Sequence, residues 1–308
     1  MAGDRLRIIC GPTATGKSDL ALALCETYNA AIVSADSRQI YCEFNVGTAK
    51  PTREECARVT HYGIDVAEPE ERYSAARWAN DANEWIESAA EIEKEAVIVG
   101  GTGLYIRAIV DPLFSAPDHD PVQRAKLERL MATMSVDDLR RWCRELDPAR
   151  AHLGRTQLLR ALETALLSGA RISDLHSRHN AAAEIDGDRQ KPAYLVVDPG
   201  DHLGARIEAR VDRMLGMGWA EEVRELMSAV SPEAPAWKAS GYMVMRRHIE
   251  GALDLSSATQ RVIIETRQYA KRQRTWFRNQ LPRAAVTHVN PDDPHALTIA
   301  REWWETAE

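Results

Sequence analysis

The chain has 308 residues, of which 44% are apolar and 28% charged, and its net charge is −7. These values predict a globular protein with one large domain carrying an insertion, or with two domains, and they argue against indiscriminate binding to nucleic acids or anionic membranes. Its five scattered cysteines form no C-x-x-C pair and no apolar run approaches the about 18 residues of a membrane span, so we expect a cytoplasmic protein without disulfides, structural zinc or a membrane segment.

The first predicted element is a short buried strand over residues 6–10, followed by a glycine-rich loop and an apolar helix over residues 19–28. The loop has the pattern G-x-x-x-x-G-K-S, formed by Gly11, Pro12, Thr13, Ala14, Thr15, Gly16, Lys17 and Ser18. Such a loop binds phosphate, because its N–H groups, the helix N-terminus and the lysine attract anions, and the serine hydroxyl can ligate Mg²⁺. A chance turn between strand and helix is the alternative. The full match predicts a phosphate or diphosphate site without naming the ligand.

A second buried strand, over residues 31–34, ends just before Asp36, which is followed by Ser37, Arg38 and Gln39. In open parallel α/β sheets the carboxyl ends of the strands face the ligand crevice, so we expect Asp36 beside the phosphate loop. A helix cap or a turn aspartate is the alternative. The position at a strand end favours the functional interpretation.

The alternation of strands and helices continues with a strand over residues 61–66, a helix over residues 75–91 and a strand over residues 96–99, after a loop that contains Lys50. The last of these strands leads into Gly100-Gly101-Thr102-Gly103. Nucleotide hydrolases with a phosphate loop commonly place a magnesium-binding aspartate at such a strand end. The Gly-Gly-Thr sequence therefore argues against ATP hydrolysis.

Residues 112–191 form a different region, in which helical patterns replace the apolar strands. We expect helices over residues 122–134, 136–146, 157–167 and 172–179. Arginines are dense here, and for any one of them a solvated helical face is the alternative to a functional role. The fold class predicted is α/β: a P-loop-type parallel sheet core flanked by helices, formed by residues 1–111 and 192–308, with a mostly helical insertion at residues 112–191.

After the insertion, a strand over residues 193–197 precedes a helix that carries Arg206, Arg210 and Arg213 on one face. These cations either face a phosphate or form surface ion pairs. The last long helix contains Arg267 to Arg278, with five cations, no acid and three aromatic residues. This segment predicts a nucleic-acid-binding surface, and its alternative is a basic amphipathic helix with its aromatics packed inward.

Six motifs occur in order along the chain: the phosphate loop, Asp36-Ser37-x-Gln39-Ile40-Tyr41, Gly47-Thr48-Ala49-Lys50-Pro51, Gly100-Gly101-Thr102-Gly103-Leu104-Tyr105, Arg160-Ala161-Leu162-Glu163 and Thr266-Arg267-Gln268-x-Ala270-Lys271-Arg272-Gln273-x-Thr275-Trp276. In this order they resemble the bacterial tRNA dimethylallyltransferase (tRNA isopentenyltransferase) family over nearly the whole chain. The resemblance implies transfer of a dimethylallyl group from dimethylallyl diphosphate to the exocyclic N6 amine of the adenosine 3′ of the anticodon, in tRNAs that read U-initial codons, with release of diphosphate. It also implies that the phosphate loop holds this diphosphate.

The resemblance further assigns roles to individual residues. Asp36 is implied as the base that takes the amine proton, Thr102 as a contact near the adenine, Lys17 and Arg210 as stabilisers of the leaving diphosphate, and Ser18 as a ligand of Mg²⁺. Residues 112–191 are implied to bind the tRNA anticodon stem-loop, and we expect a monomer. The implied tRNA contacts are Asp36, Ser37, Arg38, Gln39, Thr102, Arg124, Thr156, Gln157, Leu158, Leu159, Arg160, Arg267, Lys271, Arg272, Gln273, Arg274 and Trp276.

The chain departs from the family pattern at Arg38, at Gln157 and over residues 237–243, and these departures bear on which tRNAs are used. One alternative function is an adenylate isopentenyltransferase, which prenylates a free nucleotide and has little use for the helical insertion. A P-loop small-molecule kinase or NTPase, which turns over ATP, is another. An RNA-binding module without catalysis would leave Asp36 and the phosphate loop unexplained.

Overall fold

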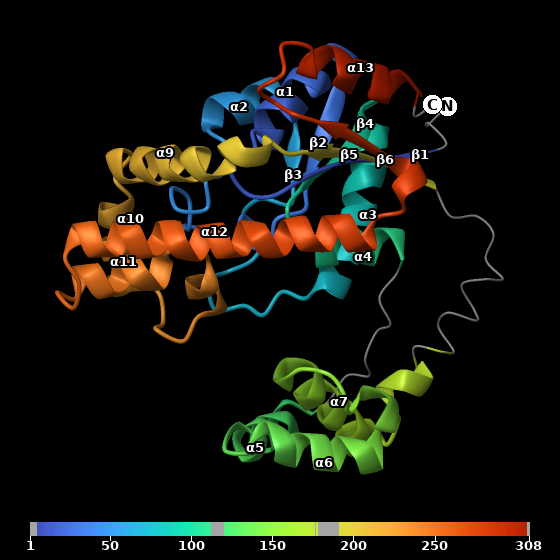
Figure 1. Cartoon of the computed structure of the whole chain (residues 1–308), viewed down its shortest axis with the longest axis vertical. Helices are drawn as coiled ribbons and strands as arrows, with labels where there is room; N and C mark the ends of the chain where they lie inside the picture. The colour runs from blue at the N-terminus through green and yellow to red at the C-terminus, as the bar shows by residue number, and fades with distance from the viewer. Residues whose placement is uncertain (1–4, 112–119, 176, 178–190, 307–308) are drawn as a thin grey trace. The chain divides into compact units, whose positions relative to one another are not determined.

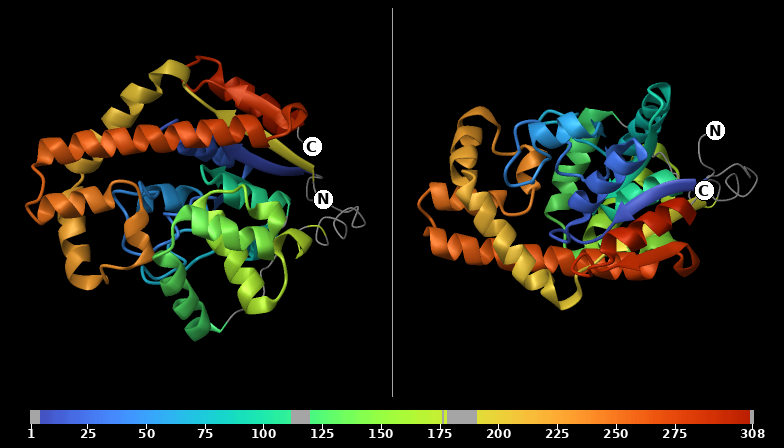
Figure 2. Two further views of the ribbon diagram at one scale, coloured as in Figure 1. Left: turned by 60° about the horizontal axis from the view of Figure 1, so that its bottom comes forward. Right: turned by 90° about the horizontal axis from the view of Figure 1, so that it is seen from above.

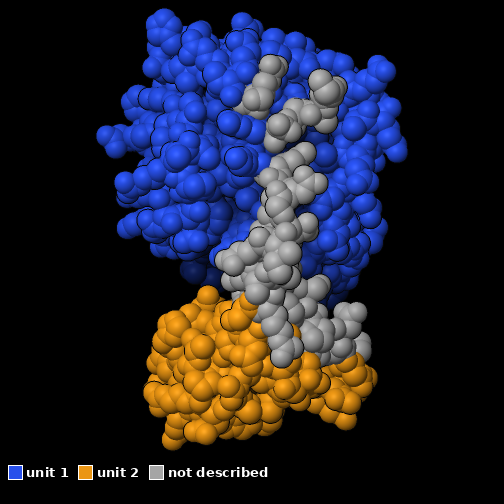
Figure 3. Space-filling model, turned by 90° about the vertical axis from the view of Figure 1, so that its right-hand side faces the viewer, with its two compact units in different colours: residues 1–112, 190–308 blue, residues 113–189 orange. Residues whose placement is uncertain are grey.

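The computed structural model describes residues 5–111, 120–175, 177 and 191–306. The chain divides into two compact units, residues 1–112 with 190–308 (unit 1) and residues 113–189 (unit 2), which Figure 3 distinguishes by colour. Each unit has its own hydrophobic core and is described separately.

Unit 1 is built on a six-stranded sheet with the order β3-β2-β4-β1-β5-β6, in which every neighbouring pair is parallel. Short runs rich in isoleucine, valine and alanine form the central strands, as expected for parallel strands covered on both faces. The predicted α/β class with a parallel sheet is confirmed. The strands are β1 (Arg5–Cys10), β2 (Ala30–Ser34), β3 (His61–Tyr62), β4 (Glu95–Gly100), β5 (Lys191–Val197) and β6 (Val286–Val289).

Helices cover both faces of this sheet (Figure 1). On one face α1 (Lys17–Tyr28) and α13 (Ala296–Thr306) pack against alternate side chains of the strands, including Ile9, Val97 and Leu195. On the other face lie α3 (Ala75–Glu91) and α4 (Gly103–Val110). The α3 helix is fastened there by Trp78, whose indole N–H donates to the carbonyl of Ser34 at 3.0 Å.

Four further helices of unit 1 form a layer beside the carboxyl ends of the strands: α9 (Leu203–Gly216), α10 (Trp219–Ala229), α11 (Tyr242–Ile249) and α12 (Leu255–Gln280). Figures 1 and 2 show the long α12, in orange, running beside α9, in yellow. Asp254 begins α12 by accepting the N–H of Ser257 at 2.8 Å, a helix cap that this sequence supplies locally. Shorter helical pieces of unit 1 are α2 (Arg53–Arg58), η2 (Gly200–His202), η3 (Pro235–Lys238) and η4 (Arg283–Ala285).

Unit 2 contains α5 (Pro121–Ala132), α6 (Val136–Leu146), η1 (Pro148–Arg150) and α7 (Arg155–Ser168). Leu139, Cys143 and Leu158 form its core, all at 0% exposure. Arg155 closes the end of α5 by donating to the carbonyls of Met131 and Ala132, both at 3.1 Å, and to that of Met134 at 2.7 Å. Residues 172–175 and 177 are helical, and residues 176, 178 and 179 of the helix predicted over 172–179 lie outside the described residues.

The structure differs from the predicted elements in several places. The strand expected over residues 61–66 stops at Tyr62, because Gly63 and Asp65 adopt left-handed backbone with φ of 76° and 54°. The sheet also has a sixth strand, β6, and a closing helix, α13, that the sequence patterns did not indicate. No helix among the described residues is long and apolar enough to cross a membrane.

Candidate active site

The phosphate loop joins β1 to α1 at the carboxyl edge of the sheet. A side chain at Gly11 would be impossible, because its Cβ would lie 2.3 Å from the carbonyl oxygen of Val197 on β5. Gly16 has φ of 83° and Ala14 has φ of 64°, so the loop curls through left-handed backbone just before the helix begins. The Thr15 hydroxyl and the Lys17 ammonium both donate to the carbonyl of Pro12, at 3.1 Å each, and hold this curl closed.

Lys17 is the central cation of the site. Burial and the neighbouring Arg210 lower the pKa of Lys17 from 10.5 to about 8, against the opposing influence of Asp36. Burial also lowers the pKa of Arg210, although that group stays charged. Two desolvated cations near a single carboxylate favour the binding of an anion at this site.

Asp36 and Thr102 follow two neighbouring strands, β2 and β4. Asp36 Oδ1 accepts the N–H of Arg38 at 2.9 Å, and Thr102 Oγ1 accepts the N–H of Ser37 at 3.0 Å. The two strand ends approach closely, since a Cβ at Gly100 would lie 2.2 Å from the carbonyl oxygen of Ala35. The carboxylate and the hydroxyl are therefore fixed at one point of the sheet edge.

Gln273 on α12 links the phosphate loop to the loop after β4. Its side-chain oxygen accepts the N–H of Thr13 at 2.9 Å, and its side-chain nitrogen donates to the carbonyl of Gly101 at 2.8 Å. The side chain is 6% exposed and both ends of its amide are bonded. We therefore assign Gln273 a positioning role in the interior.

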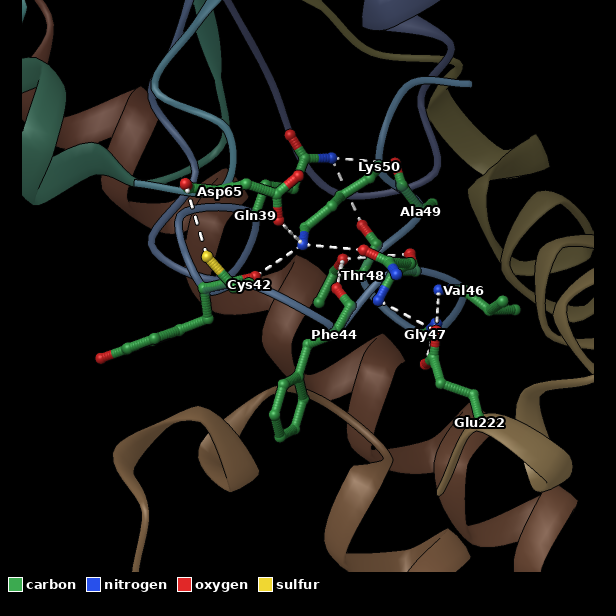
Figure 4. A network of polar contacts seen from close by, with 12 residues as sticks. Gln39, Cys42, Phe44, Val46, Gly47, Thr48, Ala49, Lys50, Asp65 and Glu222 are labelled. Carbon is green, nitrogen blue, oxygen red and sulfur yellow. Dashed lines mark hydrogen bonds and ion pairs between the residues drawn. The ribbon is translucent and has the colours of Figure 1, made fainter. Parts of the chain in front are cut away.

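A third loop, residues 45–50, lies over the carboxyl edge and is shown in Figure 4. Its Thr48 carbonyl accepts from the Gln39 side chain at 3.3 Å and from Arg210 at 3.4 Å. Lys50, the last residue of the loop, fastens it by donating to the Tyr41 carbonyl at 2.5 Å and by pairing with Asp65 (Figure 4). Gln39, predicted as a tRNA contact, thus also holds the loop that touches Arg210.

These elements line one pocket in unit 1. Its charged side chains are Lys17, Asp36, Arg38 and Arg210, and its principal apolar side chains are Val211, Met214, Trp219, Ala239 and Val262. All five apolar residues are at most 7% exposed. The pocket thus joins an ionic region to an apolar one, which suits a ligand with an anionic head and a hydrocarbon tail.

The arginine face of α9 divides into three different environments. Arg210 enters the pocket, whereas Arg213 is exposed. Arg206 lies at the mouth of the phosphate loop, with its guanidinium 3.2 Å from the position a Cβ would take at Gly16, and pairs there with Asp292. Of the two roles the sequence left open, Arg210 therefore fits the phosphate-facing one.

Some of the predicted tRNA contacts on α12 have partners within the protein, and others are exposed to solvent. Arg267 pairs with Glu208 at 2.5 Å, and Arg274 pairs with Asp198. Trp276 packs on the backbone of α4, since a Cβ at Gly103 would lie 2.4 Å from its ring. Lys271 and Arg272 instead lie exposed, in a shallow groove that they line with Gln268 and Thr275.

The predicted tRNA contacts in unit 2 are similarly mixed. Arg124 pairs with Glu163. Thr156, Gln157 and Arg160 are exposed on α7, while the side chain of Leu158 is fully buried and supports the core, and Leu159 packs partly against it.

Sequence reasoning missed several residues of this site, notably Tyr269, Trp219 and Glu222. Tyr269 lines the pocket and shares a hydrogen bond with Thr102, and burial raises the pKa of Tyr269 to about 12, so it stays protonated. Its spacing of four residues from Gln273 on one helix is the signal that places both on the inner face.

Among the described residues, the structure contains no cluster of three or more histidine, cysteine, aspartate or glutamate side chains suited to a metal. Ser18 is exposed in the first turn of α1, beside the phosphate loop. This arrangement fits a Mg²⁺ ion whose ligands would be mostly diphosphate oxygens and water, because Mg²⁺ commonly binds proteins in this way.

Comparison with known proteins agrees with this geometry. Residues 39–280 match the family model described as IPP transferase. The chain is 39% identical over 299 residues to the tRNA dimethylallyltransferase of Cyanothece sp., covering 95% of this chain and 94% of that protein. It is 40% identical over 298 residues to that of Anaeromyxobacter dehalogenans, covering 95% and 97%.

Solved structures show the same relation. The full-length tRNA isopentenylpyrophosphate transferase of Bacillus halodurans superposes with a TM-score of 0.68 at 29% identity, covering 99% of this chain and 96% of that one. A eukaryotic dimethylallyltransferase acting on tRNA superposes with a TM-score of 0.76 over 93% of this chain and 73% of that one, and at 21% identity it supports the fold alone. Sequence, fold and pocket agree, and the chain belongs to the IPP transferase family.

Proposed function

We propose that this protein transfers a dimethylallyl group from dimethylallyl diphosphate to the exocyclic N6 amine of the adenosine 3′ of the anticodon, in tRNAs that read U-initial codons. The observation that carries the proposal is the pocket in which Lys17, Asp36 and an apolar wall meet. The curated relatives at about 39% identity carry the name tRNA dimethylallyltransferase.

The ionic region binds the diphosphate. The N–H groups of the phosphate loop, Lys17 and Arg210 are proposed to stabilise the negative charge that develops as the carbon–oxygen bond breaks, and Lys17 and Arg210 both line the pocket. Both cations are desolvated and already fixed by carbonyl partners at Pro12 and Thr48, so little reorganisation accompanies the reaction. These groups therefore stabilise the diphosphate as it leaves.

Asp36 acts as the base for the adenosine amine that accepts the dimethylallyl group. In the reaction the N6–carbon bond forms, the bond from that carbon to the diphosphate oxygen breaks and its electron pair leaves with the diphosphate, and one N6 proton passes to the Asp36 carboxylate. The Arg38 N–H holds Asp36 in place, and Thr102 is held beside it through Ser37. A positioned carboxylate of this kind typically contributes on the order of 10²- to 10⁴-fold to the rate.

A Mg²⁺ ion is the cofactor we propose, with Ser18 as its one ligand from the protein. When bound, the ion would offset charge on the diphosphate. Because the protein offers so few ligands, we expect Mg²⁺ to bind together with the diphosphate, and its affinity for the protein alone to be weak.

Recognition of the tRNA is proposed to involve the exposed groove of α12 and unit 2. Lys271 and Arg272 are the cations of that groove, and Arg160 is exposed on α7 of unit 2. Exposed cations of this kind bind phosphate backbones and add salt dependence to the affinity. The protein is proposed to act as a monomer.

The test is incubation of the purified protein with Mg²⁺, dimethylallyl diphosphate and unmodified tRNA that reads a U-initial codon, followed by nuclease digestion and mass analysis of the nucleosides. We expect prenylated adenosine, and its absence would refute the proposal. AMP in place of tRNA tests the adenylate transferase, and release of phosphate from ATP, abolished by Lys17→Ala, tests the kinase or NTPase. A tRNA carrying guanosine at the target position is the matched negative control.

A further inference from the structure

The apolar part of the pocket has one aromatic wall, Trp219, the first residue of α10. Two glycines approach one edge of its indole: a Cβ at Gly47 would lie 2.1 Å from its Nε1, and a Cβ at Gly241 would lie 2.4 Å from its Cη2. The ring can approach the backbone this closely only because Gly47 and Gly241 have no Cβ. The long edge of the ring from Nε1 to Cη2 therefore rests on the backbone of two glycines, and with 1% exposure the ring is held in place beside the pocket.

The loop that carries Gly47 is itself clamped to the helix that carries Trp219. Glu222, one turn further along α10, accepts the N–H groups of Asn45 at 3.0 Å and Val46 at 2.7 Å (Figure 4). The Tyr242 hydroxyl donates to Glu222 at 2.6 Å and accepts the N–H of Gly47 at 3.1 Å. The Trp219 ring and the loop of residues 45–47 are therefore held together, because α10 supplies both the ring and the Glu222 carboxylate that binds the loop.

Hydrogen bonding gives no reason for a tryptophan here. Trp219 is 1% exposed, and no described residue accepts a hydrogen bond from its indole N–H. A buried donor left unpaired is unfavourable, and a phenylalanine or leucine would avoid it. The indole lines the same pocket as Met214 and Val262.

We propose that Trp219 sets the length of the prenyl group that the site accepts. With the ring held against the backbone of Gly47 and Gly241, the apolar part of the pocket takes the five-carbon dimethylallyl tail and excludes the ten-carbon geranyl tail. The bonds made and broken are the same for both donors: N6–carbon forms, carbon–oxygen breaks with its electron pair leaving on the diphosphate, and one N6 proton is lost. This inference rests on the proposed function.

The experiment compares dimethylallyl and geranyl diphosphate as donors to the same tRNA, using the full-length protein and the variants Trp219→Ala and Trp219→Leu. We expect the wild type to use the geranyl donor poorly. Either substitution should raise the ratio of geranyl to dimethylallyl kcat/KM by about tenfold or more, since extra methylenes in an apolar pocket are discriminated on this scale. Binding of tRNA alone, measured without donor, reports whether each variant is folded.

Trp303 on α13 is the matched control. It is 4% exposed, its indole N–H also lacks a partner among the described residues, and it lies in the core under the sheet rather than in the pocket. Trp303→Leu should leave the donor ratio unchanged. An unchanged ratio in a folded Trp219 variant, an equal change in Trp303→Leu, or efficient use of the geranyl donor by the wild type would overturn the proposal. Failure of the wild type to transfer even dimethylallyl would instead overturn the proposed function.

Discussion

The two faces of α12 carry very different kinds of polar residue. The inner face, with Thr266, Tyr269 and Gln273, is turned into unit 1 and lines the pocket. The outer face, with Gln268, Lys271 and Arg272, lines a shallow exposed groove. Even adjacent residues such as Arg272 and Gln273 thus belong to different surfaces, because successive helix positions are rotated by about 100°.

The difference shows how one helix can serve two tasks. On the inner face Gln273 is held by two partners and ties the phosphate loop to the loop after β4. On the outer face Arg272 rests against the ring of Tyr269, and its charge stays available to solvent. We therefore expect inner-face changes to affect the rate of transfer, and outer-face changes to affect the affinity for tRNA.

The largest effect is expected at Asp36, which the inner face helps to enclose. Asp36→Asn keeps the acceptor for the Arg38 N–H and removes the base, so turnover should fall on the order of 10²-fold or more, with tRNA binding kept. Single-turnover rates measure the effect, and Asp212→Asn on the exposed side of α9 is the control. A near-normal rate would remove Asp36 from the role of base.

Gln273→Ala should have the next largest effect. It leaves the N–H of Thr13 and the carbonyl of Gly101 without their partner, which costs about 1–3 kcal/mol for each buried group. A shifted phosphate loop should slow transfer on the order of 10- to 100-fold. Thermal unfolding and diphosphate binding report these losses. Gln268→Ala, five residues earlier on the outer face, should change neither, and an equal loss there would contradict the division of the two faces.

The pH dependence of diphosphate binding should follow Lys17. Because its pKa is lowered to about 8 in the free protein, Lys17 loses its proton above that pH, and diphosphate binding must restore it. Affinity should be greatest below about pH 8 and fall above it by at most about tenfold per pH unit. Calorimetry in buffers of different ionisation enthalpy measures the proton taken up, and Lys17→Met should abolish that uptake. Affinity that rises with pH would contradict this assignment.

The stability of the protein without diphosphate has the opposite pH dependence. Between the folded pKa of about 8 and the ordinary value of 10.5, the unfolded chain holds more protons on Lys17 than the folded one. Its contribution to the free energy of unfolding therefore rises with pH across that window, while diphosphate affinity falls. Opposite slopes from one residue distinguish Lys17 from a general effect of pH.

The smallest effect is expected on the outer face. Neutralising Lys271 and Arg272 together should weaken tRNA binding and lower its salt dependence, by about 0.7–0.9 in slope for each tRNA phosphate that is no longer neutralised. Arg274 is a suitable control, since its guanidinium already pairs with Asp198 and donates to the Gly200 carbonyl. Replacing Arg274 should lower the stability of the fold and leave the salt dependence of tRNA binding nearly unchanged. An unchanged salt dependence in the variant lacking Lys271 and Arg272 would exclude the groove from tRNA binding.

The local signals in the sequence were enough for much of the fold. The phosphate loop and the buried strands each depend on a few adjacent residues, and the strand ends placed Asp36 and Thr102 at one edge. The fourth residue of the β6 strand is the only one of its four that is buried, so its pattern is too weak to read, and the strand is recognised only when it pairs with β5.

Side-chain roles within the site were less predictable. Whether Gln273 faces the phosphate loop or Arg274 pairs with Asp198 depends on elements about 75 to 260 residues away, which no local pattern reports. The Trp219 wall is similar, because its shape depends on glycines at 47 and 241 that only the folded chain brings together. Long-range contacts decided what each candidate residue does.

The most direct test of the division of α12 is the single-turnover transfer rate measured across a range of tRNA concentrations, for Gln273→Ala and for the combined Lys271 and Arg272 replacement. We predict that Gln273→Ala lowers the rate at saturating tRNA and leaves the half-saturating concentration unchanged. The outer-face variant should raise the half-saturating concentration and reach the wild-type rate. If both variants change the same parameter, the two faces do not have the separate roles assigned to them.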